Sequence, residues 1–141
     1  MKTLIVEDDF TSRVLLEEIL KRHSSTHVAT NGKEALVAVR AALEAGQPYD
    51  LICLDIMMPE MDGQEALKRI RQLEDAWAER REGSIQAGIT ERHRTKVIMT
   101  TALADRANVL EAIQSQCDSF IVKPIQRRKL LDELQRLNLV T

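Results

Sequence analysis

Five short apolar runs alternate along this chain with segments of helical periodicity, and this alternation limits the fold more than any other feature. We predict strands at about 3–7, 27–29, 51–54, 97–100 and 120–122. The segments between them place apolar residues three or four positions apart, which is typical of amphipathic helices. Strands that alternate with helices indicate a parallel sheet with both faces covered. The pattern therefore predicts an α/β fold in which right-handed crossovers fix most of the topology.

The expected helices are recognised by their apolar stripes. The first begins near Thr11 and carries Val14, Leu15, Ile19 and Leu20, which we interpret as one stripe that packs on the sheet. Further helices are expected at 33–45, from Gly63 onward, at 105–116 and before Leu137.

One crossover is longer than the pattern requires. The helix that opens at Gly63 is followed by the next strand only at Lys96, whereas a crossover needs one helix and two loops of about 2–6 residues each. The surplus lies near 79–95, so either this helix is unusually long or an extra loop follows it. The segment is either a solvated insertion or a docking element with a local basic patch.

Size and charge exclude several classes of protein. A chain of 141 residues fits one domain with a real core, and its net charge of −2 argues against a dedicated nucleic-acid binder. No apolar run approaches the roughly 20 residues that span a membrane, and the first strand leaves no room for a signal peptide. We therefore expect a cytoplasmic protein. Cys53 and Cys117 do not form a disulfide framework and are expected to be packing residues.

Polar residues follow the predicted strands at the same end of each. They are Glu7 and Asp8 after the first strand, Asp55 after the third, Thr101 after the fourth and Lys123 after the fifth. In a parallel sheet these ends share one edge, where ligands bind beside the point at which the strand order reverses. Carboxylate oxygens suit Mg²⁺, and a lysine suits a phosphate. The sequence therefore predicts phosphoryl chemistry at this edge.

Four stretches give the chain a family resemblance. The chain resembles the receiver domain of two-component response regulators, in particular the single-domain chemotaxis type. The resemblance lies in residues 4–9, 50–63, 97–102 and 120–124. The resemblance implies a flavodoxin-like, doubly wound (βα)5 fold whose five-stranded parallel sheet has the order 2-1-3-4-5. It also implies a single receiver domain over 1–141, with no output domain.

The resemblance assigns the acceptor and the metal ligands. Asp55 is expected to take a phosphoryl group from a phosphohistidine on a histidine kinase or a histidine phosphotransfer protein. Asp8 is expected to bind Mg²⁺ directly, and Glu7 directly or through water. Asp55 itself and the backbone carbonyl of Met57 complete the expected ligand set. Asp stands in the place of Met57 in phosphohydrolases of the haloacid-dehalogenase type, so we expect no enzyme beyond catalysis of the chain's own phosphorylation and dephosphorylation.

The resemblance also implies how the signal is read. Thr101 and Lys123 are expected to contact phosphoryl oxygens, and Lys123–Pro124 is expected to be cis. Thr101 and Phe120 occupy the switch positions, although Phe120 has no hydroxyl to report its position and could simply be a core residue. The downstream protein is expected on the face formed by 105–116 and 120–137.

Two alternatives stay open in the sequence. The chain could be a degenerate receiver that binds proteins without being phosphorylated, although its set of acidic, hydroxyl and lysine residues is complete. It could also be a monomer or a homodimer. No nucleic-acid or membrane partner is expected.

Overall fold

The structure is a computed structural model that describes residues 1–58, 60–84, 94–102 and 117–141. Its sheet has five parallel strands in the order β2-β1-β3-β4-β5. The strands are β1 (Lys2–Val6), β2 (Ser25–Ala29), β3 (Leu51–Asp55), β4 (Lys96–Thr101) and β5 (Ser119–Val122). The order reverses beside β1, so the crevice between β1 and β3 is the expected ligand site. This confirms the predicted flavodoxin-like fold.

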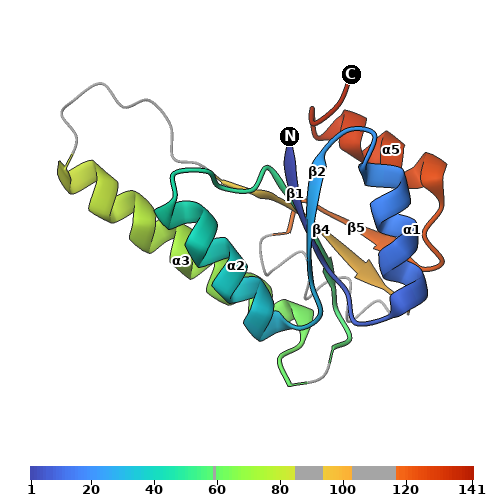
Figure 1. The fold of residues 1–141 in the computed structure, drawn as a ribbon, viewed down its shortest axis with the longest axis horizontal. Helices are drawn as coiled ribbons and strands as arrows, with labels where there is room; N and C mark the ends of the chain where they lie inside the picture. Colours follow the sequence, from blue (N-terminus) through green and yellow to red (C-terminus); the bar gives the residue numbers. More distant parts are fainter. Residues whose placement is uncertain (59, 85–93, 103–116) are drawn as a thin grey trace.

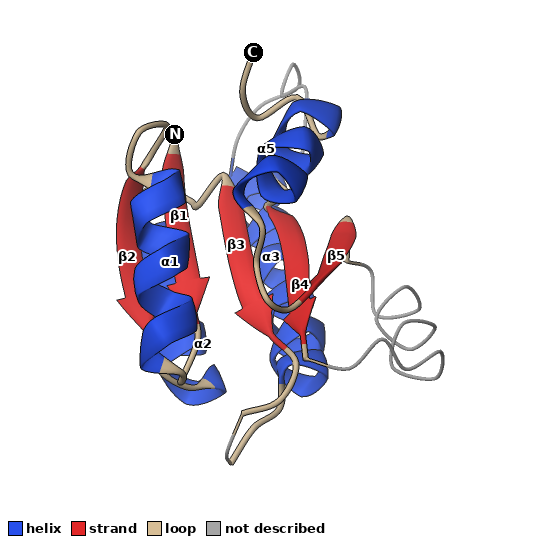
Figure 2. Ribbon diagram, turned by 90° about the vertical axis from the view of Figure 1, so that its right-hand side faces the viewer, coloured by secondary structure: helices blue, strands red, loops and turns tan. Residues whose placement is uncertain are grey.

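Helices cover both faces of the sheet. They are α1 (Phe10–Leu20), α2 (Gly32–Glu44), α3 (Gly63–Ser84) and α5 (Arg127–Arg136). Helices α1 and α5 lie on one face, and α2 and α3 lie on the other (Figure 2). The helix predicted at 105–116 lies outside the described residues. No helix in the described part of the chain is both long and apolar enough to span a membrane.

Alternate strand residues build two separate cores, because successive side chains of a strand point to opposite faces. Leu4 and Val6 of β1 join the cluster beneath α2 and α3. Ile5, between them, joins the cluster beneath α1 and α5. Central strand β3 is buried along its whole length, as expected for a strand with helices on both sides.

Short polar side chains fix the starts of three helices. The carboxylate of Asp9 accepts a hydrogen bond from Ser12 N at 2.9 Å. Asn31 and Asp62 receive matching bonds, at 2.8 and 2.9 Å, from the backbone N–H groups of Glu34 and Glu65. Each bond satisfies a backbone donor that the first turn of a helix leaves without a partner. Asp9 is therefore the cap residue of α1.

The predicted stripe of α1 is wrong at two positions. Val14 and Leu15 are 40% and 37% exposed, whereas Leu16, Ile19 and Leu20 are buried. Residues 14–16 are all apolar, so the 3.6-residue period allows more than one phase for the stripe. The direction in which α1 crosses the sheet selects the phase that buries Leu16.

Helix α3 accounts for part of the long crossover, because it runs for 22 residues and extends past the sheet (Figure 1). Residues 85–93 of the surplus segment lie outside the described residues. One of the arginines of α3 is buried in a network of charges that the sequence did not suggest. Arg71 Nη1 donates to Glu74 Oε1 at 2.7 Å and to the Thr95 carbonyl at 2.8 Å, and Nη2 lies 3.3 Å from Asp118 Oδ2. Arg94 Nη1 donates to Asp118 Oδ1 at 2.8 Å. We call these four charged residues the Arg71 network; it joins α3 to the amino-terminal ends of β4 and β5.

The two cysteines are free, and both take part in packing. Cys53 is buried in β3, and burial raises the pKa of its thiol to about 12. Cys117 is half-buried and packs against the core beneath α2 and α3. Their predicted role as packing residues is confirmed.

Candidate functional site

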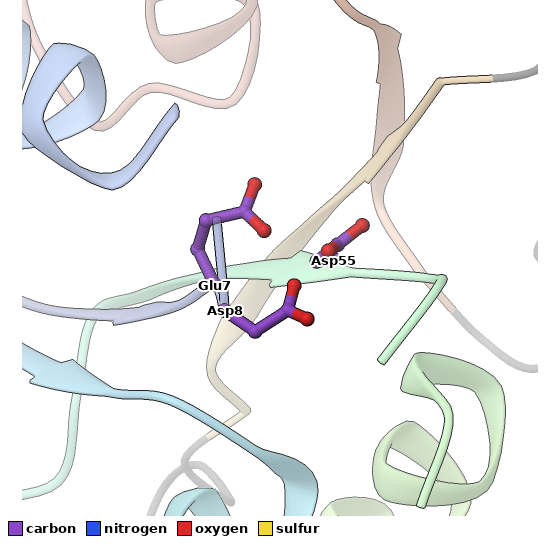
Figure 3. A group of neighbouring side chains, drawn as sticks. All are labelled: Glu7, Asp8 and Asp55. Carbon is purple, nitrogen blue, oxygen red and sulfur yellow. The ribbon is translucent and has the colours of Figure 1, made fainter. Parts of the chain in front are cut away.

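Three carboxylates meet where β1 and β3 end. Glu7 and Asp8 directly follow β1, and Asp55 is the last residue of β3. One oxygen from each carboxylate lies within 4.8 Å of the others, in an arrangement that could hold a metal ion (Figure 3). Asp8 is exposed, whereas Glu7 and Asp55 are buried. The predicted convergence of these side chains is confirmed.

Lys123 brings a positive charge from β5 to the same place. Its Nζ lies 2.5 Å from Glu7 Oε1 and 3.4 Å from Asp55 Oδ1. Its backbone N–H donates to the Thr101 carbonyl at 2.6 Å. The Lys123–Pro124 bond is cis, as the resemblance implied. Glu7 is therefore the closer ion-pair partner of Lys123, a contact that sequence reasoning missed.

Thr101 ends β4 at the same edge of the sheet. Its neighbour Thr100 is paired with Asp55 in the register of β3 and β4. The carbonyl of Thr100 also accepts a hydrogen bond from Ile56 N at 2.9 Å. Thr101 lies one residue beyond this pair and is 1% exposed. The sheet thus carries a hydroxyl residue to the end of the strand next to Asp55.

The loop after Asp55 folds back closely on β3. Met57 N donates to Asp55 Oδ1 at 3.3 Å, and Gly63 N donates to the Ile56 carbonyl at 2.9 Å. A Cβ on Gly63 would lie 2.1 Å from the carbonyl oxygen of Asp55. Only glycine fits there, so Gly63 permits the close approach of α3 to the end of β3. The side chain of Met57 is 59% exposed beside the site.

The charges at this site oppose one another. Burial raises the pKa of Asp55 well above its usual range, and the nearby Glu7 carboxylate raises it further. Burial alone would lower the pKa of Lys123, but the Glu7 and Asp55 carboxylates outweigh that effect and raise it. Three carboxylates face one ammonium, and the excess negative charge on oxygen ligands fits a hard divalent cation such as Mg²⁺.

This crowding predicts that Asp55→Asn stabilises the metal-free protein. The folded state binds the Asp55 proton more tightly than the unfolded chain does, so wild-type stability falls as the pH rises from the ordinary carboxyl pKa towards the raised one. The amide carries no charge at any pH in this range. In EDTA at pH 8 we expect the variant to gain about 1–3 kcal/mol in urea unfolding, and the gain should shrink towards pH 5.

Asp132→Asn provides a matched control, because Asp132 is an exposed carboxylate on α5. It should leave both stability and its pH dependence unchanged. If the free energy of unfolding depends on pH in the same way for wild type and Asp55→Asn, the charge of Asp55 does not destabilise the metal-free protein.

Comparison with known proteins identifies the family. A family model described as the response regulator receiver domain matches residues 3–78. The chain belongs to the response regulator receiver family. It is 31% identical over 140 residues to the chemotaxis protein CheY of Bacillus subtilis, covering 96% of this chain and 95% of that protein. The predicted identity as a receiver of a two-component phosphorelay, of the chemotaxis type, is confirmed at this level.

Solved receiver structures share this fold. One is the receiver domain of the histidine kinase CKI1 from Arabidopsis thaliana, complexed with Mg²⁺ and BeF3⁻. It is 29% identical with a TM-score of 0.77, and the match covers 97% of this chain and 89% of that one. Another is the CheX-CheY-BeF3-Mg²⁺ complex from Borrelia burgdorferi, which is 25% identical with a TM-score of 0.76 and matches 100% of this chain and 90% of that one.

Membership of this family makes the chain a signalling module. Receiver domains act through other proteins, which agrees with the expectation of protein partners. Phe120, one of the expected switch residues, is 36% exposed and does not belong to either core cluster. Its role as a switch stays a prediction. The 105–116 part of the expected partner face lies outside the described residues.

Proposed function

We propose that this receiver accepts a phosphoryl group on Asp55 from a histidine kinase or a histidine phosphotransfer protein. The proposal rests above all on the cluster of Glu7, Asp8 and Asp55 carboxylates at the carboxyl edge of the sheet, with Lys123 beside it. A phosphoryl acceptor needs positioning and charge neutralisation more than covalent work from the protein. All of these groups come from strand ends that the sheet holds in fixed register.

The donor set fits Mg²⁺, and we propose Glu7, Asp8, Asp55 and the backbone carbonyl of Met57 as its ligands. When bound, the ion supplies the positive charge that reduces repulsion between a carboxylate and a phosphoryl group. Glu7 is paired with Lys123 in the structure. This pair fixes both side chains next to Asp55, so little rearrangement is needed before reaction.

The residues of the chain divide the remaining work. An oxygen of Asp55 attacks the phosphorus, the bond from phosphorus to the histidine nitrogen breaks, and the imidazole leaves with the electron pair. The product is an aspartyl phosphate, a covalent species that carboxylates form. The Lys123 ammonium can pair with one phosphoryl oxygen, and the Thr101 hydroxyl can donate to another. The chain thereby catalyses only its own phosphorylation and dephosphorylation.

The proposed output is a change in protein binding. We propose Thr101 and Phe120 as the residues that transmit phosphorylation to a face that comprises 105–116, β5 and α5. A groove of about 280 Å³ on this face is lined by Phe120, Lys129 and Asp132, among others, which supports a partner there. The partner is either a downstream protein or a second copy of this chain. We further propose that residues 1–141 form a single receiver domain that acts in the cytoplasm.

Intact-protein mass spectrometry tests the proposal directly. Wild type and Asp55→Asn are incubated with acetyl phosphate, with Mg²⁺ or with EDTA. We expect one added phosphoryl group on wild type in Mg²⁺ only, and none on the variant. The exposed Asp132→Asn variant should behave as wild type.

Two outcomes would change the conclusion. A phosphoryl group on Asp55→Asn would place the acceptor elsewhere. No gain on wild type would favour a receiver that binds partners without phosphorylation.

A further inference from the structure

A groove between α2 and α3 lies outside the machinery proposed above. It has a volume of about 280 Å³ and includes Leu43 of α2 and Leu73 and Trp77 of α3. The two helices run side by side on the face of the sheet away from α1 and α5 (Figure 1, Figure 2). Arg80 falls within the surplus segment of the sequence, and Trp77 lies two residues before that segment on the same helix. This surface therefore borders the segment that the receiver resemblance leaves unexplained.

The groove has an apolar floor and a mostly basic rim. Leu43 is buried, and Leu73 and Trp77 are half-buried against the core. Arg40 and Arg80 line the same groove and are exposed. Within the described part of the chain, no ion pair joins either guanidinium to a carboxylate. Among the described residues that line the groove, Glu44 is the one acidic residue, so these residues keep a positive excess.

This composition is typical of the centre of a protein interface. Tryptophan and arginine are enriched among the residues that contribute most binding energy, and such residues lie in pockets that exclude water. Guanidinium groups bind carboxylates through two parallel hydrogen bonds. The volume is at the lower limit of the roughly 300–1,000 Å³ of sites for small molecules. It therefore suits one or two side chains of a partner better than a metabolite.

We propose that this groove docks a short acidic and apolar peptide segment of a partner protein. An aliphatic side chain of the segment lies between Leu73 and Trp77, and its flanking carboxylates pair with Arg40 and Arg80. A nucleic acid is a poorer occupant, because its phosphates would leave the apolar floor without a partner and the chain carries a net charge of −2.

The Arg71 network prepares this groove for binding. Arg71 and Glu74 lie six and three residues before Trp77 on α3, and their bonds to Thr95 and Asp118 hold the helix against the sheet. A wall that is fixed before binding loses less conformational entropy when the partner docks. Docking here leaves the carboxyl edge of the sheet free, so a partner could bind both the phosphorylated and the unphosphorylated receiver.

Trp77 makes the proposal measurable, because it is the only tryptophan in the chain. The probe is a blocked hexapeptide with two central leucines and two glutamates on each side. We expect a saturable change in tryptophan emission on titration of the unphosphorylated protein. Replacing the leucines with serine, or the glutamates with lysine, should abolish the change.

Charge reversal separates the groove from the rest of the surface. Arg40→Glu combined with Arg80→Glu should lower the affinity for the peptide by at least about tenfold. The matched control combines Lys21→Glu with Arg22→Glu, which changes net charge equally at two exposed positions directly after α1. It should bind as wild type does. Phosphorylation by acetyl phosphate should be unaffected in both double variants. Failure of the groove proposal is therefore distinguishable from failure of the phosphoryl-acceptor proposal.

Three results would overturn the proposal. One is a flat titration of the wild-type protein up to millimolar peptide. Another is an equal loss of affinity in the control variant, which would indicate binding by net charge alone. The third is equal binding of a short single-stranded oligonucleotide, which would indicate a site for polyanions.

Discussion

Gly63→Ala is expected to lower the free energy of unfolding by about 3–5 kcal/mol, a loss of the size that only a few mechanisms produce. The added Cβ would lie 2.1 Å from the carbonyl oxygen of Asp55 and 2.9 Å from Ile56 Cα. Both contacts are with backbone, which cannot turn aside as a flexible side chain can. Either α3 must move away from β3 or the end of β3 must shift. Urea denaturation followed by circular dichroism measures the loss.

Gly46→Ala is the matched control for this substitution. Gly46 has a φ of 71°, and its added Cβ would meet no atom within 4 Å. The control therefore carries only the cost of a left-handed backbone, about 1–2 kcal/mol. A loss at Gly63 no larger than the loss at Gly46 would show that the loop after Asp55 relaxes easily. In that case the close approach of α3 to Asp55 would not constrain the site.

Arg71→Ala is expected to cost a similar amount, about 3–5 kcal/mol. The Arg71 side chain is 8% exposed and is bonded to Glu74, Asp118 and the Thr95 carbonyl. Its removal leaves the Glu74 carboxylate buried and without its cation. Thermal and urea unfolding of the variant measure this cost.

Arg69→Ala tests whether burial is the reason for the large expected cost of Arg71→Ala. Arg69 pairs with Glu65 on the same helix at 2.9 Å, but these side chains are 54% and 48% exposed. Exposed pairs of this kind contribute about 0.3–0.5 kcal/mol. If Arg71→Ala and Arg69→Ala cost the same, the Arg71 network would be no more than a surface ion pair.

The sheet and the position of the acidic cluster could be predicted because they depend on local patterns. Strand-like runs indicate where the backbone is extended, and a parallel sheet brings their ends together. This is why Glu7, Asp8 and Asp55 were expected at one edge although they lie far apart in the sequence. Their proximity could be predicted without knowledge of side-chain packing.

Other features depend on packing and could not be predicted in the same way. Residues 14–16 are apolar in succession, so only the crossing of α1 over the sheet selects Leu16 for the core. Arg71 is one of several charged residues on α3, and its sequence neighbours do not mark it as buried. The contact of Gly63 with Asp55 is between backbone segments and leaves no side-chain pattern to detect.

The two ends of the strands differ in how well their charges are matched. At the amino-terminal end, the charges of the Arg71 network are matched in sign and bonded to backbone groups. At the carboxyl end, Glu7 and Asp55 are forced together beside one lysine. In the language of energy landscapes, one end is minimally frustrated and the other is frustrated. Small changes in charge can therefore shift populations at the carboxyl end, whereas the matched charges at the opposite end favour one arrangement.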